Sequence, residues 1–210
     1  MNLLSQTSTV KRILWAAVLG LIIAGGAFTA PMASADTEDQ DAAVTIVGGA
    51  IAVTNTAALD LTDSAGDDPS WSEDAQLVGD ITTGVTVQDH RGSGAGWYLT
   101  VESSDFEGSG DIVGESIDAE DISVKVANLA RVSGQSIHSS GGNPKGPKTS
   151  IDSYTAIDSA VTLIQADEGH GMGTYSFDAD YQLEIPALQL SGAYAATVTY
   201  TLYGAEVGNF

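Results

Sequence analysis

Acidic side chains are the groups in this sequence most able to bind a metal or transfer a proton, since 28 Asp and Glu stand against 7 Lys and Arg. In "DFEGSGD", oxygen-bearing residues occupy every second position from Asp105 to Asp111. Calcium loops place alternate oxygens in this way and end on a bidentate glutamate at the twelfth position. Here Glu115 comes one residue too early. We therefore interpret the stretch as an acidic turn between strands and predict no metal site.

The three histidines, His90, His138 and His170, have no spacing typical of a metal-ligand motif, and there is no cysteine. Asp89 and His90 are neighbours, but adjacent side chains on a strand point to opposite faces. No nucleophile with its base is indicated, so we predict a non-enzymatic protein without a cofactor. One alternative stays open: acids are plentiful enough to supply a glycoside hydrolase's carboxylate pair at about 5–9 Å.

Two aromatic-x-leucine units stand about a hundred residues apart, in "GWYLTV" and in "TVTYTL". On a strand, Trp97 and Leu99 share one face, and so do Tyr200 and Leu202. Two such strands could lay their aromatics beside each other, at roughly 0.5–1 kcal/mol per cross-strand pair. We favour a core position for Trp97, because large aromatics are mainly buried, and keep ligand contact as the alternative. The exposure of its indole distinguishes these alternatives.

The elements that position these units are short runs of alternating apolar residues, rich in Val, Ile, Thr and Tyr and bounded by Gly, Asp, Ser and Asn. This pattern predicts an all-β, single β-sandwich-like domain of short strands. The runs are 44–47, 50–53, 59–61, 85–88, 97–101, 122–126, 160–164, 174–177, 181–185 and 194–203.

Two long segments, 62–76 and 131–153, are predicted to be loops. The first is acidic and carries Trp71, and the second is rich in Gly, Ser and Pro. Loops of this length are either functional or disordered. Their length alone does not place the central site in them.

The N-terminus has the three parts of a secretory signal peptide. Lys11 and Arg12 precede an apolar run over 13–28, and Ala33-Ser34-Ala35 forms a cleavage site. The run is shorter than the roughly 20 residues that span a bilayer. We predict three parts: a cleaved signal peptide over 1–35, an acidic flexible lead over 36–43 and a β domain over 44–210.

The net charge argues against several classes of binding partner, and the lack of cysteine rules out stabilisation by disulfides. A formal net charge of −21 argues against nucleic acid, and cleavage of the signal peptide would make it more negative still. It also disfavours anionic membrane surfaces, so we predict no membrane association after cleavage. Without disulfides, the domain depends on its hydrophobic core.

Two stretches resemble the WxL domain of Gram-positive surface proteins. "VTVQDHRGSGAGWYLTVESSDF" (85–106) is similar to the first half, in which a Gly-rich turn precedes Gly-Trp-x-Leu-Thr-Val. "LEIPALQLSGAYAATVTYTL" (183–202) is similar to the second half, close to the C-terminus. The resemblance spans 44–203. One position departs, because Tyr200 stands where the family has tryptophan.

The resemblance implies noncovalent attachment to the Gram-positive cell wall, with peptidoglycan as the ligand and no catalysis. It also implies a β-rich fold that brings the two motifs together. It implies a ligand-binding role for four motif residues, Trp97, Leu99, Tyr200 and Leu202. Tyrosine keeps a flat ring but is smaller than tryptophan and brings a hydroxyl.

Two functions follow as hypotheses. The first is a secreted module at the cell surface that binds peptidoglycan or another cell-wall glycan. Because the domain is acidic and many wall polymers are anionic, such binding needs divalent bridging or a neutral glycan face. The alternative is a structural or assembly subunit that binds other surface proteins through sheet edges or loops.

Overall fold

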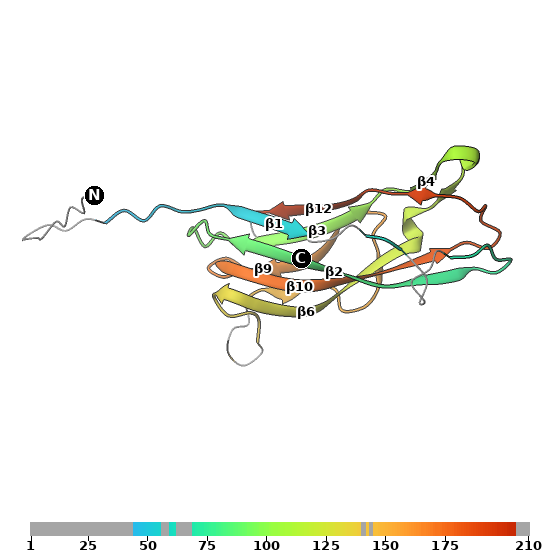
Figure 1. Ribbon diagram of the computed structural model, residues 1–210. Coiled ribbons are helices and arrows are strands. Elements are labelled where there is room, and N and C mark those ends of the chain that lie inside the picture. Colours follow the sequence, from blue (N-terminus) through green and yellow to red (C-terminus); the bar gives the residue numbers. More distant parts are fainter. Residues whose placement is uncertain (1–43, 56–58, 62–68, 140–141, 143–144, 205–210) are drawn as a thin grey trace, which may run out of the picture. The chain divides into compact units, whose positions relative to one another are not determined.

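The computed structural model describes residues 44–55, 59–61, 69–139, 142 and 145–204. The β-rich unit begins at Thr45 and is the part considered below (Figure 1). The predicted signal peptide and acidic lead lie outside the described residues and stay predictions.

Nearly all regular structure in the described residues is β-strand, as predicted. Helical structure there is limited to two 3₁₀ turns, η1 (Gly110–Ile112) and η2 (Ala119–Asp121), and no helix is long and apolar enough to cross a membrane. The strands are β1 (Ile51–Asn55), β2 (Gln76–Asp89), β3 (Trp97–Ser103), β4 (Phe106–Gly108), β5 (Ser116–Ile117), β6 (Ile122–Gly134), β7 (Lys148–Thr149), β8 (Thr155–Ala156), β9 (Val161–Ala166), β10 (Gly173–Ile185), β11 (Tyr194–Ala195) and β12 (Val198–Tyr203).

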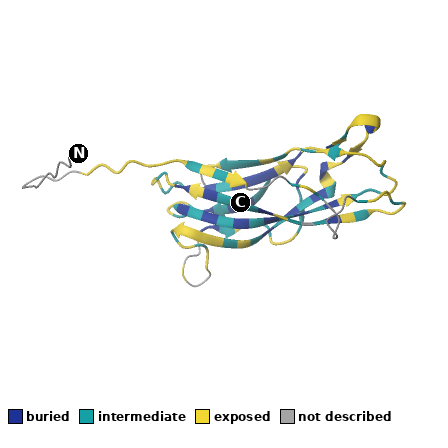
Figure 2. Ribbon diagram, viewed as in Figure 1, coloured by how far each residue is buried: buried dark blue, intermediate teal, exposed yellow. Residues whose placement is uncertain are grey.

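The strands form two main sheets and one small sheet, and the paired strands are antiparallel. The five-stranded sheet has the order β1-β2-β10-β6-β8, the four-stranded sheet β12-β3-β9-β7, and the small sheet β11-β4-β5. Buried side chains from both main sheets, such as Val87 and Phe177 from one and Trp97 and Leu99 from the other, belong to one core. Figure 2 shows buried positions alternating along these strands. The β-sandwich-like prediction is confirmed.

Strand β10 is longer than predicted, because the runs 174–177 and 181–185 join into one strand. The intervening Asp178 and Asp180 do not interrupt it, since both face away from the core and have polar partners. Asn128 donates a hydrogen bond to Asp178 at 2.7 Å, and Thr82 donates one to Asp180 at 2.6 Å. Asp can therefore lie within a strand where its side chain faces outward and has a polar partner.

Strands β2 and β6 also exceed their predicted lengths. β2 runs from Gln76 although only 85–88 was predicted, and β6 continues to Gly134 although 131–153 was predicted as loop. Both extensions pair with β10. The hydrogen bonds to β10 hold them as strands, although their less apolar sequences do not predict a strand. The remainder of 131–153 contains β7. Of the other predicted loop, 69–75 is not strand and 62–68 lies outside the described residues.

Two predicted strand runs, 44–47 and 59–61, form no strand. Ile46 and Val47 are 88% and 86% exposed. Leu59 and Leu61 pack against the core but have no strand partner, so alternation alone does not make either run a strand.

The stretch from Asp105 to Asp111, predicted as an acidic turn between strands, instead forms β4 and the first residues of η1. Phe106 is buried, and the Asp105 carboxylate accepts a hydrogen bond from the Ala119 amide at 2.8 Å. In the described part of the chain, no three His, Asp or Glu side chains are grouped to hold a metal ion.

Candidate functional site

The two aromatic-x-leucine strands are direct neighbours. β3 pairs with β12, so that Leu99 lies opposite Leu202 and Val101 lies opposite Tyr200. The motifs therefore meet, as the resemblance implied. Their aromatics do not face each other, because each precedes its leucine by two residues and the strands are antiparallel, which places Trp97 and Tyr200 on opposite sides of the Leu99–Leu202 pair.

The cross-strand aromatic pair of these strands lies on the opposite face and is not formed by the motif aromatics. Tyr98 and Tyr203 stack with ring centroids 4.5 Å apart and an interplanar angle of 11°. Tyr203 is exposed, so this stack covers the outer surface of the sheet.

Trp97 is a core side chain with 0% of its surface exposed. Its indole nitrogen donates a hydrogen bond to the Gly171 carbonyl oxygen at 2.9 Å, and its ring lies 6.0 Å from that of Tyr175. Since buried indoles need such a partner, the site is complete without a ligand. In this structure Trp97 offers no surface to a glycan.

The two leucines also pack inward. Leu99 is fully buried, and Leu202 is half-buried against the same core. The ligand-binding role assigned to Trp97, Leu99 and Leu202 stays a prediction, while their observed contacts are those of core residues.

A buried ion pair fixes the ends of both motif strands. Arg91 Nε and Nη2 each lie 2.9 Å from a carboxylate oxygen of Asp89, whose side chain has no exposed surface. The same guanidinium donates to the carbonyl of Gly96 at 2.7 Å and to that of Gly204. Gly96 precedes β3 and Gly204 follows β12, so one side chain holds the register of the two strands.

This pair determines the ionisation of Asp89. Burial alone would raise the pKa of its carboxyl, but the hydrogen bonds and charge of Arg91 outweigh burial and lower the pKa below its usual value.

Tyr200 differs from the other three motif residues because it lies at the wall of a cavity. Its hydroxyl shares a hydrogen bond with that of Tyr181, which connects β12 of one sheet with β10 of the other. Burial raises the pKa of both phenols, so both are protonated at neutral pH. The Thr83 hydroxyl is near enough to act on the pKa of Tyr200, yet it is buried and has no partner with good hydrogen-bond geometry.

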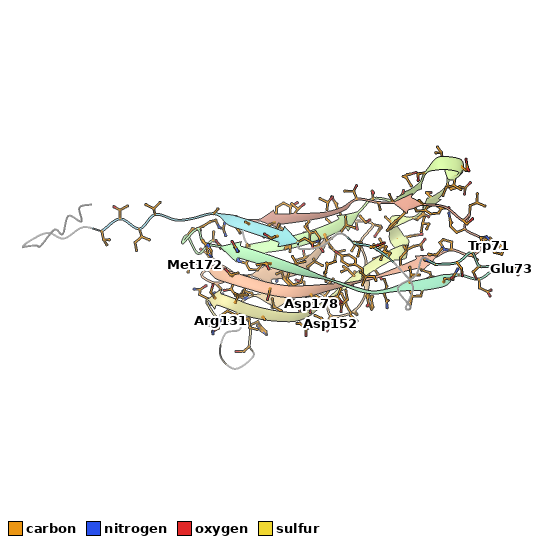
Figure 3. The ribbon with its side chains drawn as sticks, in the orientation of Figure 1. Trp71, Glu73, Arg131, Asp152, Met172 and Asp178 are labelled. Atoms are coloured by element: carbon orange, nitrogen blue, oxygen red, sulfur yellow. The ribbon has the colours of Figure 1, made fainter. Side chains whose placement is uncertain are left out.

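The cavity has a volume of about 870 Å³. Residues of β2, β10 and β12 line it together with the segments 69–72 and 186–196, which meet where the Leu188 amide donates to the Ser72 carbonyl at 3.1 Å. Trp71 is 55% exposed and lies at the end of the domain where β2 begins (Figure 3). Lys, Arg and His are absent from the described lining, and Asp60 is its one charged residue. The aromatic lining residues are Trp71, Phe106, Tyr181, Tyr194 and Tyr200.

The family model for WxL domain surface cell wall-binding proteins matches residues 39–205. The chain belongs to this WxL family. The resemblance noted from the two motifs is confirmed, and with it a cell-wall-binding domain of a cell-surface protein.

Other comparisons add little to the WxL assignment. A comparison with the curated proteins found no match. Among solved structures, a family 123 glycoside hydrolase from Clostridium perfringens, studied for glycolipid glycan hydrolysis, is similar over 75% of this chain and 25% of that chain. The identity is 12% and the TM-score 0.37, so this likeness carries no argument about activity.

The cavity of this WxL domain was not predicted from the sequence. Thr83 lies in a part of β2 that was not predicted as strand, and Tyr181 was predicted only as a strand residue. Trp71 could have indicated the cavity, because a large apolar side chain in an acidic loop is usually placed against other apolar residues.

Proposed function

We propose that this WxL domain is exported, attaches noncovalently to peptidoglycan and does not cleave it. The observation that carries the proposal is the match of residues 39–205 to a cell-wall-binding family. The aromatic-lined cavity next to the second motif supports it, because such surfaces suit sugar rings. Because the net charge is −21, the domain would be repelled by anionic wall polymers. It therefore binds uncharged parts of the wall or makes contacts bridged by divalent cations.

A sedimentation assay on purified peptidoglycan tests this function. We expect the protein to be retained with and without a chelator if it binds uncharged glycan, and only without chelator if cations bridge the contact. No retention under either condition would overturn the proposal. Release of soluble muropeptides during the same incubation would overturn its non-catalytic part.

A second candidate function is assembly with other surface proteins. It is favoured by the exposed apolar side chains of Ile46 and Val47, next to β1, and by β12, which has β3 as its one strand neighbour among the described residues. Such an edge can accept an added strand. Concentration-dependent oligomers in light scattering, together with no wall retention, would favour this function over the first.

A further inference from the structure

We propose that the cavity beside Tyr200 is a binding site for an uncharged glycan that carries acetamido groups. This inference rests on the proposed attachment to peptidoglycan and names the place and the sugar chemistry of the contact. The observations that carry it are the hydroxyl groups at the buried end of the cavity, the aromatic wall and the charges of the lining.

The buried end of the cavity has more hydroxyl protons than the protein uses. Tyr181 and Tyr200 share one hydrogen bond, in which one phenol donates and the other accepts, so one phenolic proton is left over. Thr83 adds a third hydroxyl, which is buried and close to the Tyr200 hydroxyl but makes no hydrogen bond of good geometry with the described residues. Buried hydroxyls nearly always have partners. Three hydroxyl protons therefore serve two contacts, that of Tyr181 with Tyr200 and that of Thr83 with Tyr200, so one proton is left for a ligand acceptor.

The cavity lining also has an aromatic side chain, Tyr194, that is held in place. The Tyr194 hydroxyl donates to the Leu190 carbonyl at 2.8 Å and accepts from Gln189 Nε2 at 2.8 Å. These bonds fix the Tyr194 ring before any ligand arrives, and a preordered wall reduces the entropy lost on binding. Sugar rings present C–H faces that pack on such rings. Trp71, which is 55% exposed, is a further aromatic residue of the lining.

The charges of the lining select among wall components. The described lining has no cationic side chain, and it includes the carboxylate of Asp60. A phosphate polymer or a free carboxylate would enter without a counter-charge and would lose its hydration, which is costly. An acetamido group fits instead, because its carbonyl accepts from the hydroxyls while its methyl packs against apolar wall residues.

Titration with N,N′,N″,N‴-tetraacetylchitotetraose, followed by calorimetry, tests this site. We expect Thr83→Val and Tyr200→Phe each to weaken binding about tenfold or more, since each removes one hydroxyl at the buried end. Tyr203→Phe is the matched control, because it removes a tyrosine hydroxyl from the same strand on the outer face, and it should leave the affinity unchanged. Cellotetraose, which lacks acetamido groups, should bind about tenfold more weakly than the acetylated sugar.

Three results would overturn the inference. They are no binding of the acetylated sugar, equal binding of cellotetraose, or equal loss in Tyr203→Phe. If a variant fails to fold by circular dichroism, amide shifts of the unaltered protein decide: shifts at Tyr181, Ala195 and Ala196 support the site, and shifts confined elsewhere reject it. If the unaltered protein is retained on peptidoglycan but does not bind the acetylated sugar, only the site is rejected, whereas a failure of the unaltered protein to be retained rejects the proposed function.

Discussion

The indole nitrogen of Trp97 lies 2.9 Å from the carbonyl oxygen of Gly171, a residue 74 positions later in the chain, and donates a hydrogen bond to it inside the core. This contact attaches the first motif strand to the loop between β9 and β10. It gives Trp97 a structural role that can be measured separately from wall binding.

Replacing Trp97 with alanine should destabilise the domain by about 3–5 kcal/mol, because it empties a fully buried site and leaves the Gly171 carbonyl without its donor. Urea unfolding followed by circular dichroism measures the change. Trp71→Ala is the control, since that indole is 55% exposed, and it should cost within about 0.5 kcal/mol. A stable Trp97→Ala protein would contradict the core role.

Gly171 should tolerate a side chain less well than Gly169. Both have positive φ angles, +81° and +80°, so alanine is strained by about 1–2 kcal/mol at either position. A Cβ at Gly171 would also lie 2.5 Å from Trp97 Nε1, whereas one at Gly169 would meet nothing within 4 Å. Gly171→Ala should therefore cost about 1–3 kcal/mol more than Gly169→Ala in the same unfolding assay. Equal losses would show that the backbone angle alone matters.

The sequence anticipated the arrangement of the motif strands but not that of the site. Alternation placed Trp97 and Leu99 on one face, and the structure buries both. Alternation could not show that Asp178 and Asp180 continue a strand, since their partners come from Asn128 and Thr82 on neighbouring strands.

The cavity is still less visible in the sequence, because it depends on distant contacts. The 69–72 and 186–196 segments meet through Ser72 and Leu188, and neither has a local pattern that signals the other. Tyr200 was identified from its motif alone. Its contact with Tyr181 across the two sheets follows from packing, which local residue patterns do not encode.

Acid should weaken the fold through Asp89. Its pKa is lower in the folded state than the usual value of about 3.9, so its stabilising effect is complete above that value and is lost as pH falls through the folded pKa. The free energy of unfolding should therefore decrease below about pH 4. The pKa of Asp121, raised by burial and by Asp118 and Glu120, acts in the opposite direction. The difference between the unaltered protein and Asp89→Asn isolates the Asp89 contribution, and parallel pH profiles would contradict it.

Removing Arg91 tests the same pair at neutral pH. Arg91→Ala leaves the Asp89 carboxylate buried without its partner, which should cost about 3–5 kcal/mol. It also removes the donors to the Gly96 and Gly204 carbonyls. Arg131→Ala is a suitable control, because Arg131 is exposed and should cost within about 0.5 kcal/mol. Thermal unfolding at pH 7 compares the two, and similar melting temperatures would contradict the anchoring role of Arg91.

Restoring the family residue at position 200 separates ring size from hydrogen bonding. Tyr200→Trp places a larger ring beside a cavity of about 870 Å³, so the domain should fold with a stability change below about 1.5 kcal/mol. The indole keeps one N–H donor, whereas Tyr200→Phe keeps none. We therefore expect Tyr200→Trp to bind tetraacetylchitotetraose within about threefold of the unaltered protein, while Tyr200→Phe loses about tenfold. Calorimetry on the three proteins measures this order, and a loss in Tyr200→Trp as large as that in Tyr200→Phe would show that the indole N–H does not replace the phenol hydroxyl.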